Sequence, residues 1–257
     1  MTGGLGGIGL GIALALAEQG AAIIIHDLDD GDRRAEAEKA LRAAGAREVE
    51  FVFFDLRDVE TSSGQLRRIR ESMHVDILVN NAGVQRVSPL ASMTRESWDT
   101  VLATNLSAAF DTMRCFLPGM AERGYGRVVN VSSVHGLVAS VDKSAYVAAK
   151  HGLIGLTRAA ALEYAASGDA DRGGVTVNAI CPGWVETPLI EAQVQKLAQT
   201  FGGDQTLGAQ ALLSEKQPSL RFTRPGDVGA LVVLLCSPAL HNLTGAAIPV
   251  DGGWTAQ

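Results

Sequence analysis

The chain has 257 residues, of which 47% are hydrophobic and 19% charged, and its formal net charge is −6. This composition excludes intrinsic disorder, and a net negative chain without a basic tract is a poor partner for nucleic acid or an anionic membrane. The three widely spaced cysteines fit neither a disulfide framework nor a zinc cluster, so we expect no metal and a reducing, cytoplasmic setting.

Short apolar runs rich in β-branched residues alternate with longer amphipathic stretches along the chain. Six runs predict strands buried on both faces: Ala22–Ile25, Val49–Phe54, Val75–Val79, Arg127–Val131, Val175–Ile180 and Ala247–Val250. The stretches between them predict helices, among them Asp32–Ala44, Ser97–Arg123 and Ser144–Tyr164. This alternation predicts an α/β protein in which residues 1–257 form one domain. Its core would be a single doubly wound parallel sheet of Rossmann type with helices on both faces.

A glycine-rich segment, Thr2–Gly9, precedes the first predicted helix. Glycines let a backbone approach a pyrophosphate, and the helix N-terminus supplies N–H donors, although an ordinary glycine-rich turn fits about as well. Asp27 follows the next strand, where a carboxylate can bind the adenosine ribose and repel a 2′-phosphate, which favours NAD over NADP. Asp27 could equally cap a turn. Asp55 and Leu56 follow the run Val49–Phe54, where an adenine edge could lie.

Lys150 follows Tyr146 by four positions in a segment of helical composition, so the two share one helix face. An ammonium near a phenol favours the phenolate and lowers the phenol's pKa, which suits proton transfer with an alcohol. Ser133 follows the strand Arg127–Val131, and its hydroxyl could hold a substrate oxygen or simply close a turn with Ser132. Neither pattern is decisive alone.

Together these segments resemble the short-chain dehydrogenase/reductase superfamily. The matching stretches occur in the family's order and cover nearly the whole chain: the segment Thr2–Gly9, Asn80-Asn81-Ala82-Gly83, Asn105, Ser133, Tyr146 with Lys150, and Pro182-Gly183 with Thr187.

The resemblance implies that Tyr146 is the general acid/base, that Lys150 binds the nicotinamide ribose, and that Ser133 orients the reacting hydroxyl. It implies that Asn105 supports a proton-relay water. With Tyr146 and Lys150, the implied NAD-binding residues are Gly3, Gly7, Ile8, Gly9, Asp27, Asp55, Leu56, Asn81, Gly83, Pro182, Gly183 and Thr187.

A narrower set of segments is similar to the soluble bacterial D-3-hydroxybutyrate dehydrogenases: His135–His151, Ile180–Trp184, Leu213–Ser219 and Val250–Gln257. This likeness implies NAD-dependent, reversible oxidation of (R)-3-hydroxybutyrate to acetoacetate. The implied substrate-binding residues, besides Ser133 and Tyr146, are Gln85, His135, Lys143 and Gln193 for the carboxylate, and Trp184 and Trp254 for the methyl end. It also implies a lid over about residues 184–222, and a homotetramer with its main interface on the helices Ser97–Arg123 and Ser144–Tyr164.

These side chains could also have no role in binding, since a lysine is usually exposed to solvent and a tryptophan usually packs in a core. A 3-oxoacyl-thioester reductase or a polyol dehydrogenase is the rival within the superfamily, and Arg33 and Arg34 soon after Asp27 would suit NADP. Members of the superfamily open with a hydrophobic strand, whereas Met1 alone precedes Thr2 here. We therefore expect the sheet to lack its first strand, which keeps open a non-catalytic NAD-binding protein or an inactive chain.

Overall fold

The computed structural model describes residues 1–29, 31–169, 171 and 173–256. Within these residues the strands are β1 (Ala22–Asp27), β2 (Glu48–Phe53), β3 (Ile77–Asn80), β4 (Tyr125–Val131), β5 (Gly174–Pro182) and β6 (Ala247–Val250). The α-helices are α1 (Gly7–Ala17), α2 (Arg33–Ala44), α3 (Val59–Ser72), α4 (Arg95–Leu102), α5 (Ala108–Arg123), α6 (Ser144–Tyr164), α7 (Pro188–Gln199), α8 (Gln205–Lys216) and α9 (Pro225–Cys236). Short 3-10 turns lie at Leu90–Ser92, Val134–Gly136 and Pro238–Leu240. Among the described residues, no helix is both long enough and apolar enough to cross a membrane.

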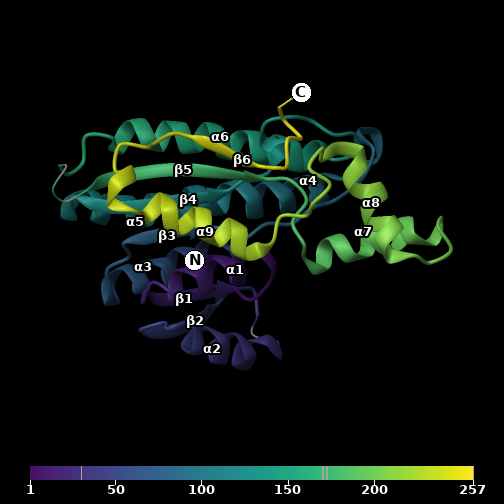
Figure 1. Cartoon of the computed structure of the whole chain (residues 1–257). Helices are drawn as coiled ribbons and strands as arrows, with labels where there is room; N and C mark the ends of the chain where they lie inside the picture. Colours follow the sequence, from purple (N-terminus) through teal and green to yellow (C-terminus); the bar gives the residue numbers. More distant parts are fainter. Residues whose placement is uncertain (30, 170, 172, 257) are drawn as a thin grey trace.

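The strands form a parallel sheet with the order β2-β1 followed by β3-β4-β5-β6. Each of the six predicted runs overlaps one strand, because β-branched side chains fill both faces of a sheet covered on both sides. Helices lie on both faces (Figure 1). The predicted α/β class and doubly wound parallel sheet are confirmed.

Successive residues of one strand enter different cores. Val129 packs in a cluster with residues of α1, α2 and α9, whereas Val128 packs in a second cluster with residues of α3, α5 and α6. This alternation follows from the two-residue period of a strand. Because helices cover both faces of the sheet, backbone and polar side chains reach solvent mainly at the strand ends. Ligands bind at the carboxyl ends of the strands in open parallel sheets.

The predicted helix Ser97–Arg123 is continuous but not uniform. α4 and α5 are joined by a π-helical turn at Ala103–Ser107. The Asn105 side chain donates a hydrogen bond to the Val101 carbonyl, 2.9 Å away, which is the acceptor that a regular α-helix would give to the Asn105 backbone N–H. Side-chain competition of this kind accounts for the widened turn, and such turns often mark functional positions.

The place of the expected first strand, between β1 and β3, holds only Met1 and Thr2. Thr2 forms parallel bridges to both His26 and Asn80, so the gap at this level is one strand wide and the two sets of strands are joined there. The expected open edge is therefore closed at the Thr2 level. A cavity of about 330 Å³, lined mostly by apolar residues, lies next to Met1 and is bordered by both β1 and β3.

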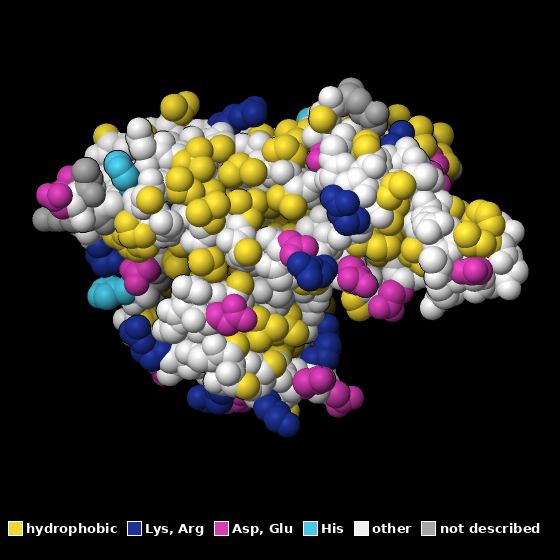
Figure 2. Space-filling model, in the orientation of Figure 1, with side chains coloured by type: hydrophobic (Ala, Val, Ile, Leu, Met, Phe, Trp, Pro, Cys, Tyr) yellow, Lys and Arg dark blue, Asp and Glu magenta, His cyan; other side chains and the backbone are white. Residues whose placement is uncertain are grey.

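Helices α7 and α8 form a hairpin that projects from the body beside the ends of β5 and β6 (Figure 1). They occupy most of the segment 184–222 in which we predicted a lid. The space-filling view shows the hairpin protruding from the rest of the molecule (Figure 2).

Candidate active site

The glycine-rich loop is tied to the carboxyl end of β3. Thr2 Oγ1 accepts hydrogen bonds from the backbone N–H groups of Asn81 and Ala82, each 3.1 Å away. The Asn81 side-chain amide donates to the Gly3 carbonyl at 2.7 Å. Asn81 therefore helps to set the path of the loop, and its contact with NAD stays a prediction.

The loop has the form of an anion cradle. Gly3 and Gly7 have φ of +62° and +51°, a region that favours glycine, and a Cβ at Gly9 would lie 2.0 Å from the Gly3 carbonyl oxygen. The first turn of α1 has neither an acidic residue nor a side-chain cap. Its N–H groups, including those of Ile8 and Gly9, are thus available to a pyrophosphate, so the residues fit a dinucleotide.

Asp27 ends β1 beside this loop. Its carboxylate accepts the Leu5 backbone N–H at 3.0 Å and the Leu28 N–H at 2.9 Å, so it caps this turn and lies beside the loop, while its binding of the adenosine ribose stays a prediction. Arg34 lies over the Phe51 ring at 5.3 Å, which turns its charge toward β2 rather than toward the loop.

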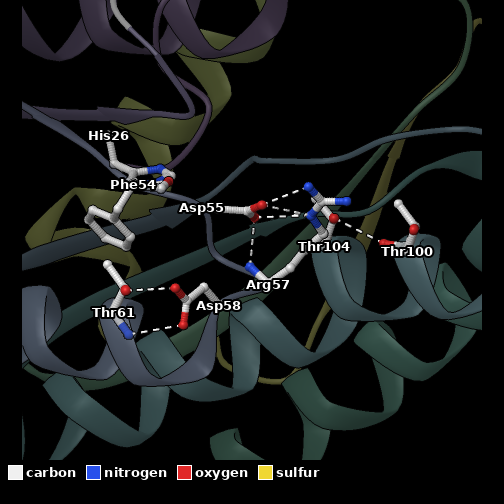
Figure 3. A network of polar contacts seen from close by, with 8 residues as sticks. All are labelled: His26, Phe54, Asp55, Arg57, Asp58, Thr61, Thr100 and Thr104. Carbon is white, nitrogen blue, oxygen red and sulfur yellow. Dashed lines mark hydrogen bonds and ion pairs between the residues drawn. The ribbon is translucent and has the colours of Figure 1, made fainter.

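Asp55 lies at the end of the next strand but is engaged in an ion pair (Figure 3). Arg57 donates to both carboxylate oxygens, with a closest approach of 2.6 Å, and these hydrogen bonds lower the pKa of Asp55. The side chain of Leu56 is buried in the apolar cluster of α3 and α5, so only its backbone is free to meet a ligand.

Tyr146 and Lys150 share one face of α6, as their spacing predicted. Lys150 is only 3% exposed, and its Nζ donates to the Val131 carbonyl at 2.7 Å while lying 5.6 Å from the Tyr146 ring centroid. Burial lowers the pKa of Lys150 to about 8. Burial also raises the pKa of Tyr146, and a hydrogen bond with Ser133 opposes that rise. The prediction that Lys150 lowers the tyrosine pKa is wrong for this arrangement, because the ammonium faces a carbonyl and desolvation dominates.

Ser133 and Asn105 approach the same region from two other segments. Ser133 follows β4 and its Oγ accepts the His135 backbone N–H at 3.1 Å. The Asn105 amide donates to the Val84 carbonyl at 2.9 Å, and its Oδ1 is buried without a partner among the described residues. A Cβ at Gly83 would lie 2.7 Å from this oxygen. An unpartnered buried oxygen suits a bound water, which agrees with the relay role implied for Asn105.

All eight predicted substrate-binding residues line one cavity of about 120 Å³. They come from five separate stretches of the chain: Gln85, Ser133 with His135, Lys143 with Tyr146, Trp184 with Gln193, and Trp254. The predicted cofactor-binding residues Ile8, Pro182, Gly183 and Thr187 line it too. Thr187 also lies against Gly7, since a Cβ there would be 3.4 Å from Thr187 Cγ2. The structure thus joins the substrate cavity to the glycine-rich loop.

Positive charge and imidazole meet at one wall of this cavity. Lys143 Nζ lies 3.4 Å from His135 Nε2 and 5.6 Å from the Trp184 ring centroid. Burial and the neighbouring Lys143 lower the pKa of His135 to about 4, so His135 is neutral at pH 7. Burial also lowers the pKa of Lys143, while Glu215 opposes the shift. The charge of this wall at neutral pH therefore belongs to Lys143.

Two tryptophans lie beside this wall. The Trp184 and Trp254 rings are 5.3 Å apart, and Trp254 makes an edge contact with His135 at 5.6 Å. Sequence reasoning missed the apolar and hydroxyl residues between them, because they belong to no motif: Ser132, Val134, Val185 and Ile190. It also missed Gln217, whose amide oxygen accepts the Trp184 backbone N–H at 3.0 Å.

Comparison with known proteins defines the class. The family model described as enoyl-(acyl carrier protein) reductase matches residues 3–255. The D-beta-hydroxybutyrate dehydrogenase of Cupriavidus necator is 47% identical over 258 residues, which span 100% of this chain and 97% of that protein. The D-beta-hydroxybutyrate dehydrogenase of Rhizobium meliloti is 39% identical, spanning 100% and 98%. The chain belongs to the short-chain dehydrogenase/reductase family and is an oxidoreductase of that family.

Solved structures agree on the fold. L-sorbose reductase from Gluconobacter frateurii, in a complex with NADPH and L-sorbose, superposes with a TM-score of 0.90 at 29% identity, covering 100% of this chain and 95% of that one. An actinorhodin polyketide ketoreductase variant with NADPH gives a TM-score of 0.88 at 33% identity, covering 100% and 96%.

Proposed function

We propose that this chain catalyses the NAD-dependent interconversion of (R)-3-hydroxybutyrate and acetoacetate. The observation that carries the proposal is the position of Lys143, which lines the same small cavity as Ser133 and Tyr146. The printed names of the two bacterial relatives support the same substrate.

The cavity suits a short acid with one anionic end. Within the described part of the chain Lys143 forms no ion pair, so its charge is open to a substrate carboxylate. Neutral His135 and the amides of Gln85 and Gln193 add hydrogen-bonding capacity around it. Trp184 and Trp254, which also line the cavity, would bind the methyl end and limit the chain length. The hydroxyl on the third carbon of such an acid, counted from the carboxylate carbon, would then reach Ser133 and Tyr146.

The chain's own groups position that hydroxyl and move its proton. Ser133 holds the oxygen, and Tyr146 takes the proton on oxidation and returns it on reduction. Lys150, whose Nζ is held by the Val131 carbonyl, would bind the nicotinamide ribose, and Asn105 holds a water for proton exchange with solvent. NAD, when bound, supplies the acceptor of the hydride from the carbinol carbon. It would lie along Thr2–Gly9, Asp27, Asn81 and Thr187.

NAD is preferred to NADP because Asp27 keeps a carboxylate beside the loop, and a 2′-phosphate would be repelled there. Of the two arginines that would suit NADP, Arg34 stacks on β2, whereas Arg33 Nη1 would lie 3.2 Å from a Cβ at Gly6 in the loop. The preference for NAD therefore rests on Asp27. The hairpin of α7 and α8 acts as a lid, since Ile190 and Gln193 on α7 line the cavity.

A homotetramer is part of this proposal. Phe110 on α5 and Leu162 on α6 are 47% and 81% exposed, so the helices predicted to form the main interface carry unsheltered apolar side chains. Apolar side chains also gather on the face that carries α9 and β6 (Figure 2). Light scattering coupled to gel filtration tests the assembly, and a monomer would refute it.

Steady-state turnover of (R)-3-hydroxybutyrate and of its methyl ester, each with NAD and with NADP, tests the function. We expect kcat/KM to be highest for the acid with NAD, because the ester removes the charge that Lys143 binds. Equal or better turnover of the ester, or of a longer uncharged alcohol, would favour a thioester reductase or polyol dehydrogenase. NAD binding without any turnover would favour a non-catalytic protein.

A further inference from the structure

Gln217 follows α8 directly and is one of the most deeply buried polar residues among those described, at 1% exposure. A buried amide must have its hydrogen bonds satisfied inside the protein. Its Oε1 accepts the Trp184 backbone N–H at 3.0 Å, and its Nε2 donates to the Arg221 carbonyl. One side chain therefore connects the end of the lid hairpin to the peptide that carries a wall of the substrate cavity.

The same side chain fills the space between two glycine-containing turns. A Cβ at Gly183 would lie 2.7 Å from Gln217 Oε1, and a Cβ at Gly252 would lie 2.7 Å from Gln217 Cγ. The Ser219 backbone N–H donates to the Gly252 carbonyl at 2.9 Å, so the chain after α8 is also fastened to the turn that precedes Trp254. Gln217 thus touches the backbone immediately before Trp184 and near Trp254.

We infer that Gln217 is a positioning residue that fixes the two tryptophans against each other and thereby sets which chain length the cavity accepts. This inference rests on the proposed function for its substrate. The two rings lie 5.3 Å apart, and Lys143 lies over one of them, so a shift of the Trp184 peptide changes both the methyl wall and the carboxylate wall. Ser133, Tyr146 and Lys150 make no hydrogen bond to Gln217, so proton transfer is left in place.

The test replaces the amide with a side chain of similar length, Gln217→Met, beside the matched control Gln210→Met on the exposed face of α8. Loss of a buried hydrogen bond implies a rise in KM for 3-hydroxybutyrate of roughly 5- to 100-fold, with kcat and the KM for NAD nearly unchanged. The ratio of kcat/KM for the homologue one methylene longer to that for 3-hydroxybutyrate should also rise. The control should change none of these values.

A second readout does not need turnover. Trp184 and Trp254 are close enough to couple as chromophores, so we expect a couplet in the circular dichroism spectrum that Gln217→Met weakens and Gln210→Met keeps. Gln217→Glu keeps an acceptor for the Trp184 N–H, so it should retain more of the couplet than Gln217→Met. If Gln217→Met does not fold, Gln217→Glu is used in its place. An unchanged couplet and an unchanged chain-length ratio would overturn the inference. Inactivity of the wild type with 3-hydroxybutyrate would instead refute the proposed function, and the couplet would still test Gln217.

Discussion

Replacing Lys143 by methionine separates the charge of the substrate wall from its packing. Methionine keeps a long unbranched stem against Trp184, whose ring centroid lies 5.6 Å from Nζ. It removes the cation that, among the described residues, is the only one to line the cavity at pH 7. A hydrogen bond to a charged group contributes about 1.5–3 kcal/mol. Because Lys143 is half-buried and partly screened, we expect the lower half of that range, which corresponds to a rise in KM of about 10- to 40-fold.

The assay is steady-state oxidation of (R)-3-hydroxybutyrate and its methyl ester at saturating NAD. The KM of the acid should rise while that of the ester stays constant, and NAD binding measured by tryptophan quenching should not change. In the wild type, the KM for the acid should also rise as pH increases through the lowered pKa of Lys143, since the anion binds the protonated form; the variant should lose this dependence. A parallel loss for acid and ester, or a loss of NAD binding, would refute the assignment of Lys143 to the carboxylate.

Three further predictions address the proton, the loop and the sheet. Burial keeps the pKa of Tyr146 above its usual value of about 10, so log kcat/KM for oxidation should rise by about one per pH unit through neutrality. Reduction uses the protonated phenol, so its kcat/KM should not change with pH over the same range. A pH profile with the opposite slopes would contradict this. Gly9→Ala should weaken NAD binding and lower the melting temperature because its Cβ meets the Gly3 oxygen, whereas Gly64→Ala in open space on α3 should stabilise by about 0.5–1 kcal/mol in urea denaturation. Thr2→Val should lower the free energy of unfolding by roughly 2–4 kcal/mol because the backbone N–H groups of Asn81 and Ala82 lose their acceptor, whereas Thr2→Ser should lower it little. Equal urea midpoints for the two variants would show that the hydroxyl is not needed.

Local pattern was enough to predict the strands because burial on both faces leaves a continuous apolar signal. The ends of the strands were less predictable. Val75 was predicted as strand, yet β3 begins at Ile77, and the Val75 carbonyl accepts a hydrogen bond from the Arg123 side chain at 2.7 Å instead of joining the ladder. That competition depends on where the end of α5 lies, which no local pattern encodes.

The candidate site could be predicted wherever a motif fixes both residue type and spacing. Tyr146 and Lys150 share a helix face for that reason, but the direction of the tyrosine pKa could not follow from spacing. It depends on burial and on the Val131 carbonyl that Lys150 binds. The π-helical turn was hidden similarly, because Asn105 widens the helix through a bond to the Val101 carbonyl that a helical pattern does not reveal.

Gln217 lies in the segment Leu213–Ser219 that carries part of the resemblance, but its contacts could not be predicted from the sequence. Its amide bonds to a peptide 33 residues earlier in the chain, and the glycines that make room for it precede Trp184 and Trp254 at the ends of β5 and β6. These segments meet only because parallel strands bring their carboxyl ends to one edge of the sheet. The same edge brings Lys143 and His135 to the cavity from the connection between β4 and α6. We therefore expect a change at Gln217 to alter substrate selection before it alters proton transfer.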